Sequence, residues 1–130
     1  GRLYSSLGKW DDMYKISTEV ISHSLSNQSG YNESTLREAY FYAGLYQMNY
    51  LKNDTALQYF YKCDELSRIL DIGEQSGFMV MSNLKIGMIY DLQNKRDLAI
   101  IQYDKVSNMT AYQGSRDMAK QYLKKPYGKF

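Results

Sequence analysis

The sequence predicts an all-α protein built from stacked pairs of helices, and three observations support that prediction. A Lys-x-Asp triplet recurs at one interval of 43 residues, at 9–11, 52–54 and 95–97. Small or apolar residues follow each Asp at closely matching offsets. The single proline, Pro126, lies beyond the last periodic segment and therefore interrupts no helix. A fixed period of this length with helical spacing inside it is typical of a repeat array.

The repeat register is defined by residues two, six and nine positions after each Asp. They are Met13, Ser17 and Val20 in the first repeat, Ala56, Phe60 and Cys63 in the second, and Ala99, Tyr103 and Val106 in the third. Gly44 and Gly87 lie ten residues before the second and third Asp. These positions therefore serve as fixed points for aligning the repeats.

Apolar spacing near 3.6 residues predicts the individual helices. They are expected over 10–26, 35–51, 54–70, 78–93 and 97–109, with a short last helix over about 115–124 that begins after an N-cap at Ser115. Residues 1–7 are predicted to end a further helix, because Tyr4 falls in register with Gln47 and Tyr90. The chain is thus interpreted as a piece of a larger array that begins inside a repeat.

The triplet itself is interpreted as structural. Each Lys is expected in the turn between paired helices, and each Asp is expected to cap the second helix of its pair. The echo of Gln28–Gly30 at Gln75–Gly77 is offset by 47 residues, which places an insertion in the connector Tyr31–Thr35. The predicted organisation is one domain, 1–130, with a partial repeat at 1–27, repeats at 34–71 and 77–110, and a capping helix at 115–124.

Composition excludes several classes of partner. The formal net charge is +2 and the hydrophobic fraction is 44%, so neither nucleic acid nor an anionic membrane is indicated. No apolar run is long enough to span a bilayer. A single cysteine rules out an internal disulfide, and the first residues lack a signal-peptide pattern. The compartment stays unknown, although both features favour the cytoplasm.

The chemistry-bearing side chains are too few for an enzyme. His23 lies in a Ser-rich stretch but without a nucleophile elbow, and it is interpreted as a surface histidine. Cys63 holds an inter-helix position of its repeat, so a buried structural thiol is expected. No metal-ligand set and no phosphate-binding glycine loop is present in the sequence, so no catalytic residue, metal or cofactor is predicted.

The segments Gly44…Ala56…Phe60 and Gly87…Ala99…Tyr103 resemble the tetratricopeptide repeat in its long-repeat variant. The glycine–alanine interval is 12 residues in both. The period of 43 also falls within the range of HEAT and armadillo repeats, but the small–Ala–aromatic spacing favours the tetratricopeptide family. Met13 and Ser17 depart from the pattern, so the first repeat is degenerate.

The resemblance implies a fold, a surface and a function. The fold is a right-handed superhelix of antiparallel helix pairs, an α-solenoid, with a C-terminal capping helix. The concave surface carried over from the family consists of Phe41, Tyr42, Leu45, Met48, Asn49, Met81, Leu84, Lys85 and Met88. The function is a non-enzymatic scaffold that binds a protein or peptide, such as an amphipathic or apolar segment.

Two alternatives stay open. The chain could belong to a regulatory or sensor protein whose repeats receive a peptide or pack on an output domain. The apolar face could equally be buried against further repeats, a neighbouring domain or a second copy of the chain.

Overall fold

Six α-helices make up the computed structural model, which describes residues 2–25, 33–71, 77–109 and 112–128. They are α1 (Arg2–Leu25), α2 (Glu33–Asn49), α3 (Asn53–Leu70), α4 (Gly77–Leu92), α5 (Arg96–Ser107) and α6 (Gln113–Lys124). The described ranges contain no strand, so the all-α prediction is confirmed. None of the helices in these ranges combines the length and apolar character that crossing a membrane requires.

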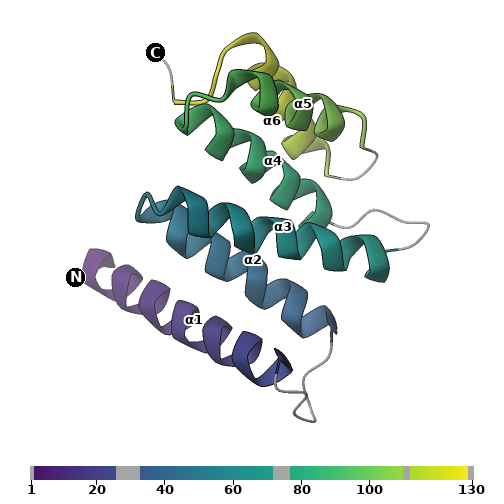
Figure 1. The fold of residues 1–130 in the computed structure, drawn as a ribbon. Coiled ribbons are helices and arrows are strands. Elements are labelled where there is room, and N and C mark those ends of the chain that lie inside the picture. The colour runs from purple at the N-terminus through teal and green to yellow at the C-terminus, as the bar shows by residue number, and fades with distance from the viewer. Residues whose placement is uncertain (1, 26–32, 72–76, 110–111, 129–130) are drawn as a thin grey trace.

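The helices stack in two rows (Figure 1). In row A, α4 contacts both α2 and α6. In row B, α1, α3 and α5 contact their sequence neighbours in row A, and among the described residues the backbones of α1 and α3, and of α3 and α5, approach one another less closely than the backbones within row A. Row A is therefore the more closely packed side of the stack.

Each complete helix pair is held together by a glycine against an aromatic ring. A Cβ atom on Gly44 would lie 2.8 Å from Cε1 of Phe60, and one on Gly87 would lie 2.6 Å from Cε1 of Tyr103. Both rings are fully buried. Any side chain at these glycines would collide with the ring, so the two helices of each pair approach closely at this point.

The turns within the two pairs share one backbone geometry. Leu51 adopts a left-handed conformation with φ 59°, and the N–H of Lys52 donates to the carbonyl of Gln47 at 2.8 Å. Asn94 and Lys95 repeat this arrangement, also with φ 59°. This is the Schellman motif, which satisfies carbonyls left free at a helix end. Lys52 and Lys95 lie in turns as predicted, and their backbone N–H groups make the contact. Lys9, which was also expected in a turn, lies inside α1.

The recurring aspartates do something other than what was predicted. Asp54 and Asp97 lie in the first turns of α3 and α5, as expected. The carboxylate of Asp54, however, accepts a hydrogen bond from Nε2 of Gln93 at 2.8 Å. Asp11 likewise accepts one from the Tyr46 hydroxyl at 2.9 Å. The aspartates of the first two triplets therefore link a row B helix to the next row A helix.

Two predicted boundaries were wrong. The structure continues α1 through Lys9 without a turn, whereas residues 1–7 were expected to form a separate helix end. Extending an existing helix costs less than nucleating a short one with no partner, which accounts for the difference. Helix α6 begins at Gln113 rather than after Ser115, and its N-cap is Tyr112. The insertion expected at Tyr31–Thr35 falls partly outside the described residues, and Glu33–Thr35 are helical.

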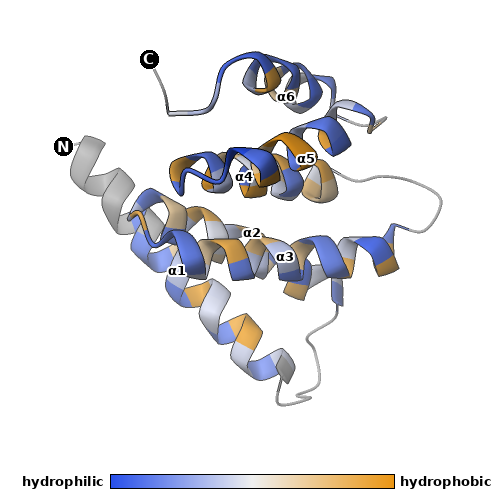
Figure 2. Cartoon of the chain, turned by 45° about the horizontal axis from the view of Figure 1, so that its top comes forward, coloured by the Kyte–Doolittle hydropathy of each residue, from blue (hydrophilic) through white to orange (hydrophobic). Residues whose placement is uncertain are grey.

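The core consists of two adjoining clusters, one centred on each complete helix pair. The first is formed mainly by α2 and α3 with Ile86 and Ile89 of α4, and the second by α4, α5 and Ala119 of α6. Met48 packs against both clusters. Helix α6 is mostly hydrophilic, as Figure 2 shows.

The Gly87–Tyr103 contact predicts how the pair responds to a single methyl group. Tyr103 cannot move aside freely, because its hydroxyl donates to Asp91 at 2.7 Å. We expect Gly87→Ala to destabilise the fold by about 1–2 kcal/mol, the overpacking cost less the gain in helix propensity. Urea unfolding monitored by circular dichroism measures the change. Gly114→Ala is the control, since nothing lies within 4 Å of its added Cβ, and it should stabilise by about 0.5–1 kcal/mol.

The left-handed Leu51 predicts a stabilising substitution. Its side chain is 74% exposed, so little packing is lost on removal. Leu51→Gly should raise the free energy of unfolding by about 0.5–1 kcal/mol, because glycine adopts positive φ without steric cost. Leu51→Ala keeps the strain and should show no gain in the same urea titration. Equal effects of the two substitutions would contradict the strain.

Candidate functional site

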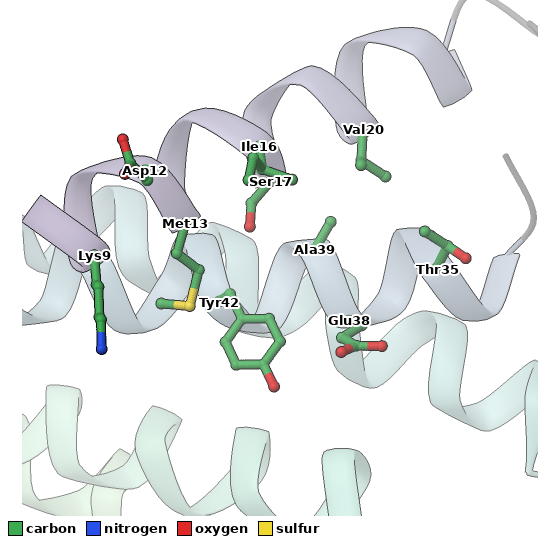
Figure 3. A pocket seen from close by; sticks show the side chains of 10 residues that line it. All are labelled: Lys9, Asp12, Met13, Ile16, Ser17, Val20, Thr35, Glu38, Ala39 and Tyr42. Atoms are coloured by element: carbon green, nitrogen blue, oxygen red, sulfur yellow. The ribbon is translucent and has the colours of Figure 1, made fainter.

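A solvent-open pocket of about 470 Å³ lies between α1 and α2 (Figure 3). Helix α1 contributes Lys9, Asp12, Met13, Ile16, Ser17 and Val20, and α2 contributes Thr35, Glu38, Ala39 and Tyr42. We call this the α1–α2 pocket. Its volume is in the range of sites that hold a side-chain cluster or a small ligand.

The floor of the α1–α2 pocket is apolar and its ends carry charge. Ile16 is 60% exposed at the edge of the hollow. Lys9 lies at one end, while Glu38 lies towards the other end with Thr35 (Figure 3). An exposed apolar surface bordered by charge is typical of an interaction site.

The predicted concave surface is only partly accessible. Phe41, Leu84 and Met88 are core residues with at most 5% exposure. Tyr42, Leu45, Met48, Met81 and Lys85 are half-buried, and Asn49 is exposed. Burial lowers the pKa of Lys85, because desolvation disfavours its charged form.

Tyr42 alone connects the predicted surface to the α1–α2 pocket. The α1 residues of the pocket were not among the predicted site residues. A signal for them was nevertheless present in the sequence. Met13 and Ser17 are the two positions at which the first repeat departs from the small–aromatic pattern. Such departures locate a place where the usual packing of a helix pair cannot be completed.

Buried polar groups between α3 and α4 form a structural network. Asp64 accepts hydrogen bonds from Asn83 at 2.7 Å and Arg68 at 3.0 Å. Arg37 of α2 makes two 2.8 Å bonds to Asp71, at the end of α3. Hydrogen-bonded ion pairs of this kind fix how neighbouring helices sit, and their carboxylates are occupied.

A second polar network ties the last helix to the stack. Buried Asp91 accepts hydrogen bonds from the Tyr103 hydroxyl at 2.7 Å, from Arg96 at 3.0 Å and from the N–H of Tyr127 at 2.9 Å. Arg96 also donates to the carbonyl of Tyr122 at 2.7 Å, in the last turn of α6. A cation there satisfies free carbonyls and complements the negative helix end.

Neither of the two residues considered for catalysis, Cys63 and His23, lines the α1–α2 pocket. Cys63 is fully buried in α3, as expected for a structural thiol, and His23 lies near the C-terminal end of α1. In the part of the chain that the structure describes, no three His, Cys, Asp or Glu side chains group as metal ligands.

Comparison with protein-family models, with curated proteins and with solved structures finds no match to this chain. The helices and the pocket define the class of protein: a helical-repeat-like all-α protein with a pocket between two of its helices.

The burial of Cys63 predicts a silent thiol. Burial raises the pKa of the Cys63 thiol to about 12, so the reactive thiolate is scarce at neutral pH. Ellman's reagent at pH 8 should label this residue only at the rate at which the chain opens, and at once in denaturant. A chain carrying Ile101→Cys, at a 61% exposed position, should show one fast and one slow thiol. Rapid labelling of the unmodified folded chain would contradict burial.

Proposed function

We propose that this chain is a non-enzymatic module of the tetratricopeptide type that binds a protein or peptide. The observation that carries the proposal is the α1–α2 pocket, an apolar hollow of about 470 Å³ that is open to solvent. Large exposed apolar side chains cost solubility, and they persist on surfaces that another molecule covers. Pockets of this kind, between the helices of an α-protein, are common binding sites.

The tetratricopeptide assignment is supported by the repeated helix-pair contact. Gly44 against Phe60 and Gly87 against Tyr103 lie 43 residues apart, and both glycines precede an identical turn. The closer approach of the helix backbones along row A than along row B favours curvature towards row A. We therefore place the pairs in a right-handed superhelix, with row A on the concave side and α6 as its cap.

The binding surface that we propose joins the pocket to the accessible part of the concave surface. Tyr42 belongs to both, and the other accessible members extend the surface along α2 and α4. They are Leu45, Met48, Asn49, Met81 and Lys85. Methionine and tyrosine suit such a surface, since methionine adapts its shape and tyrosine offers a large apolar ring with a hydroxyl.

A displayed library of random peptides tests this function. Selection against the wild-type chain should enrich peptides that bind the α1–α2 pocket. Ile16→Glu should weaken those peptides by about tenfold or more, because it sets an unpaired charge on the apolar contact. Fluorescence anisotropy measures each affinity.

Ile101→Glu is the matched control for Ile16→Glu. The two isoleucines are 61% and 60% exposed, and Ile101 lies on α5, away from the pocket. Its substitution should leave affinity within about twofold. Selection that enriches no peptide, or peptides that bind the Ile16→Glu chain as well as wild type, would overturn the proposal.

A further inference from the structure

The α1–α2 pocket occupies the place where row A would continue beyond α2. Apart from Lys9, its lining residues correspond, 43 positions earlier in the sequence, to residues of α3 and α4, the two helices that pack against α2. We call α2, α3 and α4 the next layer. Met13, Ser17 and Val20 of α1 correspond to Ala56, Phe60 and Cys63 of α3, and Thr35 and Ala39 of α2 correspond to Phe78 and Ser82 of α4. In the next layer, α2 packs against both α3 and α4. The pocket thus presents, on α1 and α2, the two surfaces that flank a row A helix.

The next layer shows how such a helix is gripped. The ring of Phe41 on α2 lies edge-on to two aromatic rings, at centroid distances of 5.8 Å from Phe60 and 5.4 Å from Phe78. The guanidinium of Arg37 also lies 5.2 Å from the centre of the Phe78 ring. Gly44 then lets α2 approach the Phe60 ring.

The two gripping aromatics are replaced by small polar residues in the pocket. Ser17 stands where α3 has Phe60, and Thr35 stands where α4 has Phe78. Ser17 is only 4% exposed, so it forms part of the floor of the pocket, and the hollow of about 470 Å³ lies above it. A helix that enters here needs a bulky side chain where α2 has Gly44, because glycine against Ser17 would leave a void.

We propose that the α1–α2 pocket binds an amphipathic helix of a partner protein, which takes the row A position and places a large apolar side chain, Leu, Met or Phe, against Ser17. This inference rests on the proposed function and names its partner class. The pocket continues the row A interface already formed by α2, α4 and α6, so the bound helix runs parallel to α2 and antiparallel to α1.

Charge at the pocket ends agrees with this direction. A helix parallel to α2 has its N-terminal end near Thr35 and Glu38 and its C-terminal end near Lys9 (Figure 3). The positive end of the helix dipole then faces a carboxylate, and the negative end faces an ammonium group. Asp12 offers an acceptor, one turn from Lys9, for a basic side chain on the partner helix.

The chain's own α2 provides the probe. Three acetylated, fluorescein-labelled peptides carry the sequence of residues 33–49: unchanged, with Gly44→Ala and with Gly44→Leu. Alanine and leucine have similar helix propensities, so comparing them isolates side-chain size. Anisotropy titrations measure the affinity of each peptide for the wild-type chain.

The Leu peptide should bind about tenfold more tightly than the Ala peptide, since its side chain fills the space beside Ser17. Ile16→Glu should abolish that binding and Ile101→Glu should preserve it. Two further versions of the Leu peptide carry a spin label, one at the N-terminal end and one at the C-terminal end. Only the C-terminal label should broaden the amide NMR signals of α1 near Lys9. Equal affinities for the Leu and Ala peptides, absence of binding, the reverse orientation, or a longer form of the protein whose own residues before Gly1 fill the pocket and keep the Leu peptide out, would overturn the inference.

A substitution on the pocket side of the contact supplies a second test. Ser17→Phe restores the ring found at Phe60 and should cancel or reverse the preference for Leu over Ala. Circular dichroism checks that this variant folds. If it does not fold, the affinities of the Leu and Ala peptides for the wild-type chain decide between the two outcomes.

The outcome also separates this inference from the proposed function. Library peptides that depend on Ile16, combined with no preference for Leu over Ala, would leave the function standing and refute the helix. Failure of both the library and the designed peptides would refute both.

Discussion

The approach of a glycine in row A to an aromatic ring in row B is the constraint on which the rest of the stack depends. It sets how near α2 lies to α3 and α4 lies to α5, because the rings of Phe60 and Tyr103 fill the space that a side chain on the glycine would take. The short turns between the paired helices follow from that spacing. In α1 the position that corresponds to Phe60 is held by Ser17, and it lines the α1–α2 pocket.

Much of the fold could be predicted because its causes are local. Helical spacing located α2 to α5 to within a few residues, and the glycine positions identified the contacts between paired helices. The continuous α1 was not predictable, since Gly8 and Lys9 fall in register with the turns of the other repeats. Whether a turn forms there depends on a helix to pack against, which is a tertiary property.

The site was less accessible to sequence reasoning. Family positions placed Phe41, Leu84 and Met88 on a surface, yet in these helices they fill the core, because Phe41 lies between Phe60 and Phe78. The α1–α2 pocket forms where a small residue, Ser17, replaces the aromatic residue of the repeat. In the sequence such a site shows only as a departure from the repeat pattern. Abundant tyrosine, in contrast, has a clear use: pairs such as Tyr14–Tyr46, Tyr40–Tyr59 and Tyr103–Tyr122 meet across successive helix interfaces.

The polar network around Asp91 joins three parts of the chain at one carboxylate. Asp91 belongs to α4, and its donors are the Tyr103 hydroxyl and the Arg96 guanidinium of α5 and the N–H of Tyr127, which follows α6. Arg96 also donates to the carbonyl of Tyr122 in the last turn of α6. Loss of the Asp91 carboxylate would therefore leave buried donors unpaired on several elements at once, so this one side chain couples the positions of α4, α5 and α6.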